Sequence, residues 1–146
     1  MTPYQKACIR ESFALVAPIS DQVAFDFYAR LFGSDPSLRK LFAHTDMAGQ
    51  RKILMQTLTV VVKSLDKLDQ IVPAVQALGR RHAGYGVRES HYATVGEALL
   101  WTLEQGLGEA FTPEVRAAWT EAYGTLATVM IEAARADTET PAEAAA

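Results

Sequence analysis

The helical spacing of apolar residues that leads to His82 constrains this chain more than any other feature of its sequence. Ile71, Val75 and Leu78 precede it by eleven, seven and four positions, so all of these side chains share one face of an α-helix. Glycines two and four positions later predict that the helix ends there. A buried imidazole must be hydrogen-bonded or bind a ligand. On position alone, a hydrogen-bonded core histidine is the commoner explanation and a binding role is the alternative.

Helical spacing recurs along the rest of the chain, and no segment has the alternation of a strand. Cap residues at Thr2, Ser20, Asp35, Asp69 and Thr112 predict helix starts. The expected helices cover about 3–17, 20–33, 36–42, 47–65, 69–83, 88–107 and 113–135. About seven helices of unequal length predict an irregular all-α domain. We expect one domain over residues 1–136 and a small, polar, disordered tail at 137–146.

Composition excludes several classes of function. The 146 residues are 49% hydrophobic and carry a net charge of -3, which argues against a nucleic-acid partner. We find no signal peptide and no apolar run long enough to cross a membrane, so a cytoplasmic protein is expected. Cys8 is the one cysteine, which rules out an intrachain disulfide or a cysteine-based metal cluster. Common enzyme motifs are absent.

A few polar side chains interrupt the apolar helix faces, and they are the candidates for chemistry. Taken one at a time, each has an ordinary structural explanation as a core residue, a packing residue or a residue near a helix end. They are Tyr28, Gln50, His82, Tyr92 and Tyr123.

Several segments, in order and with compatible spacing, resemble the globin family from about Tyr4 to Ile131. The pair Phe27-Tyr28 and the stretch Gln50-Arg51-Lys52 are similar to bacterial single-domain haemoglobins and to the haem domains of flavohaemoglobins. Other segments resemble vertebrate neuroglobin: Leu78-Gly79-Arg80-Arg81-His82, Gly86-Val87, Thr94-Val95-Gly96-Glu97-Ala98-Leu99-Leu100, Phe111-Thr112-Pro113, Arg116-Ala117-Ala118-Trp119 and Tyr123-Gly124. The resemblance implies a globin fold around a haem.

The resemblance assigns roles on both sides of that haem. His82 matches the proximal histidine, which would make it the ligand to iron in a b-type haem. Gln50 and Leu54 match the distal pair, and Tyr28 matches a second-helix residue that reaches the distal pocket. Tyr28 and Gln50 would both donate hydrogen bonds to bound dioxygen. We expect the carbonyl of Leu78, four residues before His82, to accept the other imidazole N–H.

Further positions match residues that line the haem in this family. Phe42 matches the phenylalanine that packs on the porphyrin, and Val87 and Val95 match apolar lining residues. Tyr92 matches a tyrosine that flavohaemoglobins place beside the proximal histidine. His44 matches a position at the haem edge, where a contact with a haem propionate is the role that the resemblance offers.

Three departures from these relatives limit what can be carried over. The cysteine bridge that neuroglobin has near the fourth helix is impossible with Cys8 alone. Gln50 replaces the distal histidine of neuroglobin, and a carboxamide is a poor ligand for ferrous haem, so an open sixth position is expected. The glutamate that flavohaemoglobins place near the proximal histidine matches Ala134 here. Glu132 is two residues away, roughly 200° around the helix, and should not reach the histidine. A strong peroxidase-like character is therefore not expected.

These matches predict an oxygen-binding globin that takes dioxygen, nitric oxide and carbon monoxide. Two alternatives stay open. A nitric oxide dioxygenase would need an external reductase, since we find no flavin- or nicotinamide-binding segment. A globin-type gas or redox sensor would need an output domain or a partner surface, and purified protein that takes up no haem would favour that class.

Overall fold

The computed structural model describes the chain as far as residue 145, with side chains described for residues 1–136. Six α-helices and three short 3-10 helices follow one another, and the described residues contain no strand. The expected all-α architecture is confirmed. The elements are α1 (Pro3–Val16), η1 (Ala17–Ile19), α2 (Ser20–Ser34), η2 (Pro36–Phe42), α3 (Met47–Lys63), α4 (Leu68–Gly84), α5 (Glu89–Leu107), η3 (Gly108–Ala110) and α6 (Pro113–Ala145).

Side-chain caps set several helix starts. Thr2 accepts the backbone N–H of Gln5 at 3.1 Å, and the Gln5 side chain accepts the N–H of Thr2 at 2.9 Å. The side chains of Asp35, Asp46 and Thr112 each accept one backbone N–H at the start of η2, α3 and α6, respectively.

Two predicted caps are wrong. Ser20 is the first residue of α2, which continues directly from η1, so the N-cap position is Ile19 and no side chain caps it. Asp69 lies in the first turn of α4, one position past the start, and the N-cap is Lys67. The Asp69 carboxylate therefore acts only through its favourable position in the field of the helix dipole.

α6 is assigned as helix to Ala145, beyond the predicted end near Arg135. The predicted disordered tail at 137–146 falls on residues whose side chains lie outside the described part of the chain, so that prediction is not tested. The boundary of the predicted domain at residue 136 stays a prediction for the same reason.

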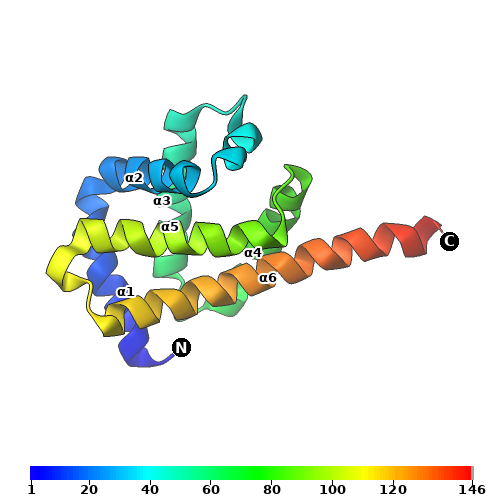
Figure 1. Cartoon of the computed structure of the whole chain (residues 1–146). Helices are drawn as coiled ribbons and strands as arrows, with labels where there is room; N and C mark the ends of the chain where they lie inside the picture. The colour runs from blue at the N-terminus through cyan, green and yellow to red at the C-terminus, as the bar shows by residue number, and fades with distance from the viewer. Residues whose placement is uncertain (146) are drawn as a thin grey trace.

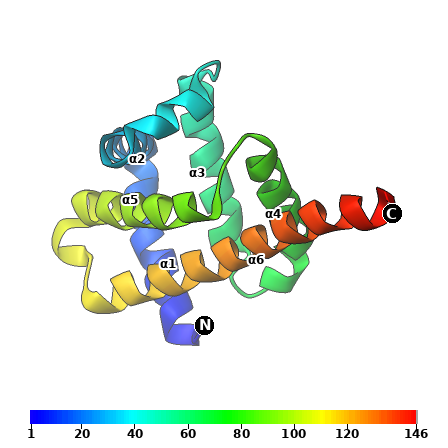
Figure 2. The same cartoon turned by 45° about the vertical axis from the view of Figure 1, so that its right-hand side comes forward.

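The core lies where α1, α2, α5 and α6 cross (Figures 1 and 2). Ile9, Val16 and Leu103 are at most 1% exposed there. The indole N–H of Trp119 donates to the hydroxyl of Ser12 at 2.8 Å, which satisfies the buried polar groups of both residues. The two remaining helices, α3 and α4, pack on the outside of the helices that form this core.

α3 and α4 pack on different neighbours. α3 lies mainly against α2, whereas α4 lies mainly against α6 (Figure 2). Among the described residues α3 and α4 make no extensive contact with one another. None of the described helices is both long enough and apolar enough to cross a lipid bilayer.

Candidate functional site

His82 lies in the last turn of α4, with one ring nitrogen in a hydrogen bond and the other nitrogen free. Its Nδ1 lies 2.8 Å from the carbonyl oxygen of Leu78, as the sequence predicted. A carbonyl can only accept, so Nδ1 carries the proton and donates, and Nε2 keeps its lone pair. Nε2 has no hydrogen-bond partner among the described residues. Burial lowers the pKa of His82, and the nearby Arg81 charge lowers it further, so the imidazole is neutral at pH 7.

Two glycines fix the position of that histidine. A Cβ on Gly79 would lie 2.6 Å from Cα of Met130, so α4 approaches the α6 backbone more closely than any other residue would allow. Gly86 has φ of 96°, in the left-handed region, and turns the chain just after α4. The N–H of Val87 donates back to the carbonyl of His82 at 3.0 Å, which closes the corner.

Tyr28 and Gln50 meet where α2 crosses α3. Tyr28 is 6% exposed, and the side-chain N–H of Gln50 donates to its hydroxyl oxygen at 3.1 Å. Burial raises the pKa of Tyr28, so the hydroxyl keeps its proton. That proton has no acceptor among the described residues. The sequence predicted two independent donors; the structure instead joins them and leaves the tyrosine O–H as the donor without a protein partner.

An aromatic cluster holds Tyr28 in place. The rings of Phe32 and Phe42 are 5.4 Å apart, and each also contacts the Tyr28 ring, at 6.0 and 5.7 Å between centroids. Phe42 was predicted as a site residue, but Phe32 was not. Its spacing of four residues from Tyr28 on one helix was the signal that could have identified it.

Apolar residues predicted to line the site are only half-buried. Leu54 and Val95 pack against the core on one side, yet both remain partly accessible, as does Val87 at the corner. In a binding site for a flat apolar group, the protein alone leaves apolar side chains partly accessible, because the group itself covers them when it binds. Half-buried apolar residues, a neutral imidazole with a free nitrogen and a buried hydroxyl donor together fit haem.

The remaining predicted residues take different places. Tyr92 is half-buried, and its carbonyl oxygen accepts the hydroxyl of Tyr123 at 2.6 Å. Burial raises the pKa of both tyrosines, so both stay protonated. His44 is exposed in the turn after η2. Glu132 is exposed on α6 and has no hydrogen bond among the described residues.

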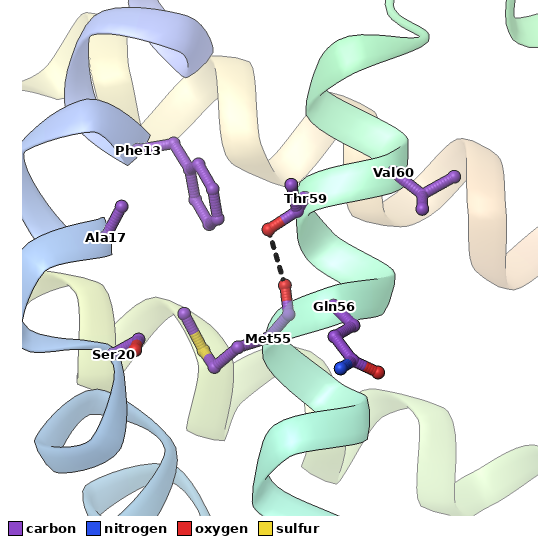
Figure 3. Close-up of a pocket in the computed structure, with 7 residues that line it drawn as sticks. All are labelled: Phe13, Ala17, Ser20, Met55, Gln56, Thr59 and Val60. Carbon is purple, nitrogen blue, oxygen red and sulfur yellow. Dashed lines mark hydrogen bonds between the residues drawn. The ribbon is translucent and has the colours of Figure 1, made fainter.

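A separate hollow of about 390 Å³ lies between α1, η1, the start of α2 and α3 (Figure 3). Phe13 and Met55 face each other across it, and the hydroxyl of Thr59 donates to the carbonyl of Met55 at 2.7 Å. The other lining residues are Ala17, Ser20, Gln56 and Val60. None of the predicted site residues lines this hollow, so it is distinct from the His82 and Tyr28 site.

Comparisons with known proteins identify the family of this chain. The family model described as Globin matches residues 25–130. The chain is 32% identical over 138 residues to a flavohemoprotein of Bordetella parapertussis, and the match covers 93% of this chain and 34% of the relative. Flavohemoproteins of Rhodopirellula baltica and Bacillus subtilis are 33% and 30% identical, and each match covers 84% of this chain and 31% of the relative.

This chain thus spans about a third of the length of the flavohemoproteins that it matches. The predicted resemblance to flavohaemoglobin haem domains is confirmed, and the family match covers well over half of the chain. The chain therefore belongs to the globin family and is a haem globin.

Proposed function

We propose that this globin reversibly binds dioxygen, and also nitric oxide and carbon monoxide, at a b-type haem held by His82. The observation that carries the proposal is the hydrogen bond from Gln50 to Tyr28, because it holds a buried hydroxyl whose own proton has no protein acceptor. Ferrous haem supplies the iron atom to which such diatomic molecules bind. The remaining interactions in the proposal are made by side chains of the protein.

Three residues have distinct roles in this proposal. The free Nε2 of His82 would hold the haem iron, and the Leu78 carbonyl fixes the tautomer of the ring and raises its basicity. The Gln50 amide donates to Tyr28 and is a poor ligand for iron, so it would leave the binding place of the diatomic molecule open. The Tyr28 O–H would donate a hydrogen bond to dioxygen there and would stabilise negative charge on it.

Oxygen dissociation kinetics test this assignment. A hydrogen bond to a partly charged acceptor contributes about 1.5 kcal/mol or more, which corresponds to roughly tenfold in rate. Tyr28→Phe should therefore accelerate dissociation of dioxygen about tenfold in a stopped-flow experiment in which carbon monoxide replaces it. Gln50→Leu removes the group that orients the hydroxyl and should give a smaller acceleration.

Tyr123→Phe is the matched control, because it deletes a half-buried tyrosine hydroxyl that donates to a backbone carbonyl instead. Its dissociation rate should equal that of the parent protein. An unchanged rate in Tyr28→Phe would mean that another group, or none, donates to the ligand.

The similarity to flavohemoproteins favours a second candidate, a nitric oxide dioxygenase. In that reaction one nitric oxide, one dioxygen and one electron give one nitrate ion. The described residues contain no strand and hence no strand-based dinucleotide fold, so a different protein or a further part of a longer chain must supply the electron. A cytoplasmic location belongs to the same proposal. Sustained nitric oxide consumption with an added reductase would support this role, whereas a single stoichiometric turnover would reject it.

A further inference from the structure

The stretch of chain around His82 is attached to α6 at both of its ends. At one end, Gly79 of α4 lies so close to Met130 that a Cβ there would be 2.6 Å from the Met130 Cα. At the other end, Glu89 begins α5 and forms an ion pair with Arg135. The two attachment points on α6 are five residues apart, about 7.5 Å along the helix axis. One short stretch of α6 therefore holds both ends of the segment that contains the proposed iron ligand.

Two hydrogen bonds join the side chains of Glu89 and Arg135. Nε of Arg135 donates to Oε1 of Glu89 at 2.5 Å, and Nη2 donates to Oε2 at 2.8 Å. The planar guanidinium thus matches both carboxylate oxygens, which fixes the orientation of the pair as well as its distance. The hydrogen bond from Arg135 lowers the pKa of Glu89, so the carboxylate is charged at neutral pH. Glu89 also lies in the first turn of α5, where the helix dipole favours a negative charge.

Hydrogen bonds also connect the start of α5 to the last turn of α4. The N–H of Arg88 donates to Nδ1 of His91 at 2.9 Å, which satisfies a free donor at the helix start. The N–H of Val87 donates to the carbonyl oxygen of His82 at 3.0 Å. Because Val87 and Arg88 directly precede Glu89 in the chain, a displacement of Glu89 would change the position of His82.

The loop between α4 and α5 does not by itself fix this arrangement. Residues 83–86 are exposed and include two glycines, which allow many backbone conformations. α4 packs mainly on α6, whereas α5 packs mainly on α2, so the two helices rest on different neighbours. The hydroxyl of Tyr123 on α6 also binds α5, at the carbonyl oxygen of Tyr92. Among the described hydrogen bonds between α5 and α6, those of Glu89 are nearer to His82 in the chain.

We propose that the ion pair of Glu89 with Arg135 positions His82 for the iron. It holds the start of α5 against α6, and through Val87 it keeps the free Nε2 of His82 directed into the site. Both members of the pair are positioning residues, since they act through His82 and not on the haem itself. This inference rests on the proposed function, because it takes His82 as the residue that holds the iron.

Haemin loss and resonance Raman scattering of the holoprotein test this proposal. Glu89→Gln keeps an acceptor but removes the charge that holds the guanidinium. It should speed the loss of haemin to an excess of apomyoglobin about threefold, which is the size of change expected for one exposed ion pair. In the deoxygenated ferrous protein it should broaden the iron–histidine stretching band, because the ring takes up more orientations. A loss of stability alone would not change that band.

Glu97→Gln is the matched control. Glu97 is also an exposed residue of α5, and it accepts a hydrogen bond from an arginine on another helix, Arg30 of α2, at 2.7 Å. Each of the two substitutions removes one negative charge and one ion pair between helices. Glu97→Gln should leave both haemin loss and the stretching band unchanged, because its ion pair lies outside the segment that holds His82.

A double-mutant cycle shows whether Glu89 acts through Arg135. In the Arg135→Gln background, Glu89→Gln should cause no further change in haemin loss or in the stretching band. Arg135→Lys keeps the positive charge but cannot match both carboxylate oxygens at once. Its rate of haemin loss should therefore lie between those of the parent protein and Arg135→Gln.

Three results would overturn the proposal. Unchanged haemin loss and an unchanged band in Glu89→Gln would show that the pair does not position His82. Equal changes in Glu89→Gln and Glu97→Gln would assign them to a general loss of charge. A full effect of Glu89→Gln in the Arg135→Gln background would mean that Glu89 acts without Arg135. Failure of the proposed function is distinguishable, because the band would then be absent from the parent protein or would persist in His82→Ala.

Discussion

At the scale of single residues, we expect the protonation state of His82 to decide whether the proposed site can hold iron. The hydrogen bond to Leu78 fixes the proton on Nδ1, and burial lowers the pKa of the ring, so Nε2 presents a lone pair. The same burial has a cost. When the pH falls, the unfolded chain takes up a proton at this ring before the folded chain does.

This difference predicts an acid sensitivity in the haem-free protein. The folded pKa of His82 lies below its unfolded value of about 6.5, so stability is constant above that value and decreases as the pH falls below it. The decrease is limited to less than about 1.4 kcal/mol per pH unit, because one proton is involved and the ring is partly accessible. Urea unfolding at pH 7.5 and 5.5 should show a smaller loss in His82→Gln than in the parent.

His44→Gln is the control for that experiment, because His44 is exposed in a turn. It should lose as much stability as the parent between the two pH values. An equal loss in all three proteins would mean that the protonation of His82 is not linked to folding.

Sequence predicted some side-chain contacts and missed others for one physical reason. The contact of His82 with the Leu78 carbonyl follows from the spacing of four residues along one helix, so local geometry alone determines it. The bond between Gln50 and Tyr28 depends on how α2 crosses α3, and no local pattern specifies that crossing. Both residues were identified as site residues, but their pairing was not.

At the scale of elements, the packing of α4 against α6 places His82. The contact is close because Gly79 has no side chain, and a Cβ there would clash with the backbone of Met130 rather than with a movable side chain. Backbone atoms cannot move away as a flexible side chain can, so α4 and α6 would have to separate. The proposed iron ligand lies only three residues further along α4.

Gly79→Ala should therefore destabilise the protein although alanine is the better helix former. Overpacking costs typically 1–3 kcal/mol, and the gain in helix propensity of about 1 kcal/mol offsets it only in part. Gly124→Ala is the matched control, since nothing lies within 4 Å of a Cβ there, and it should be neutral or slightly stabilising. Urea unfolding measures both. Equal stability of the two variants would contradict the close approach of α4 and α6.

Element boundaries show where sequence patterns fail at this scale. Thr2, Asp35 and Thr112 were identified as caps because each precedes a proline at the first helical position. Ser20 and Asp69 were misassigned because a serine or aspartate is equally acceptable inside the first turn. Without a proline to fix the register, a start cannot be placed to the exact residue.

At the scale of the whole molecule, we expect a bound haem to act as part of the core. α3 and α4 each pack on another helix and make no extensive contact with one another among the described residues. Half-buried apolar residues such as Leu54, Val87 and Val95 remain at the site. A bound macrocycle would cover such surfaces and would bridge elements that otherwise stand apart.

Haemin should therefore raise the unfolding temperature, and the iron bond should account for a separable part of the rise. Ligand at 1,000 times its Kd contributes about 4 kcal/mol, which corresponds to roughly 10 °C in a chain of this size. Iron-free protoporphyrin IX offers the same apolar surface without a bond to His82, so its shift should be smaller. In His82→Ala, haemin should give only the protoporphyrin shift, as measured by thermal unfolding followed by circular dichroism. A full haemin shift in that variant would place the iron ligand elsewhere in the chain.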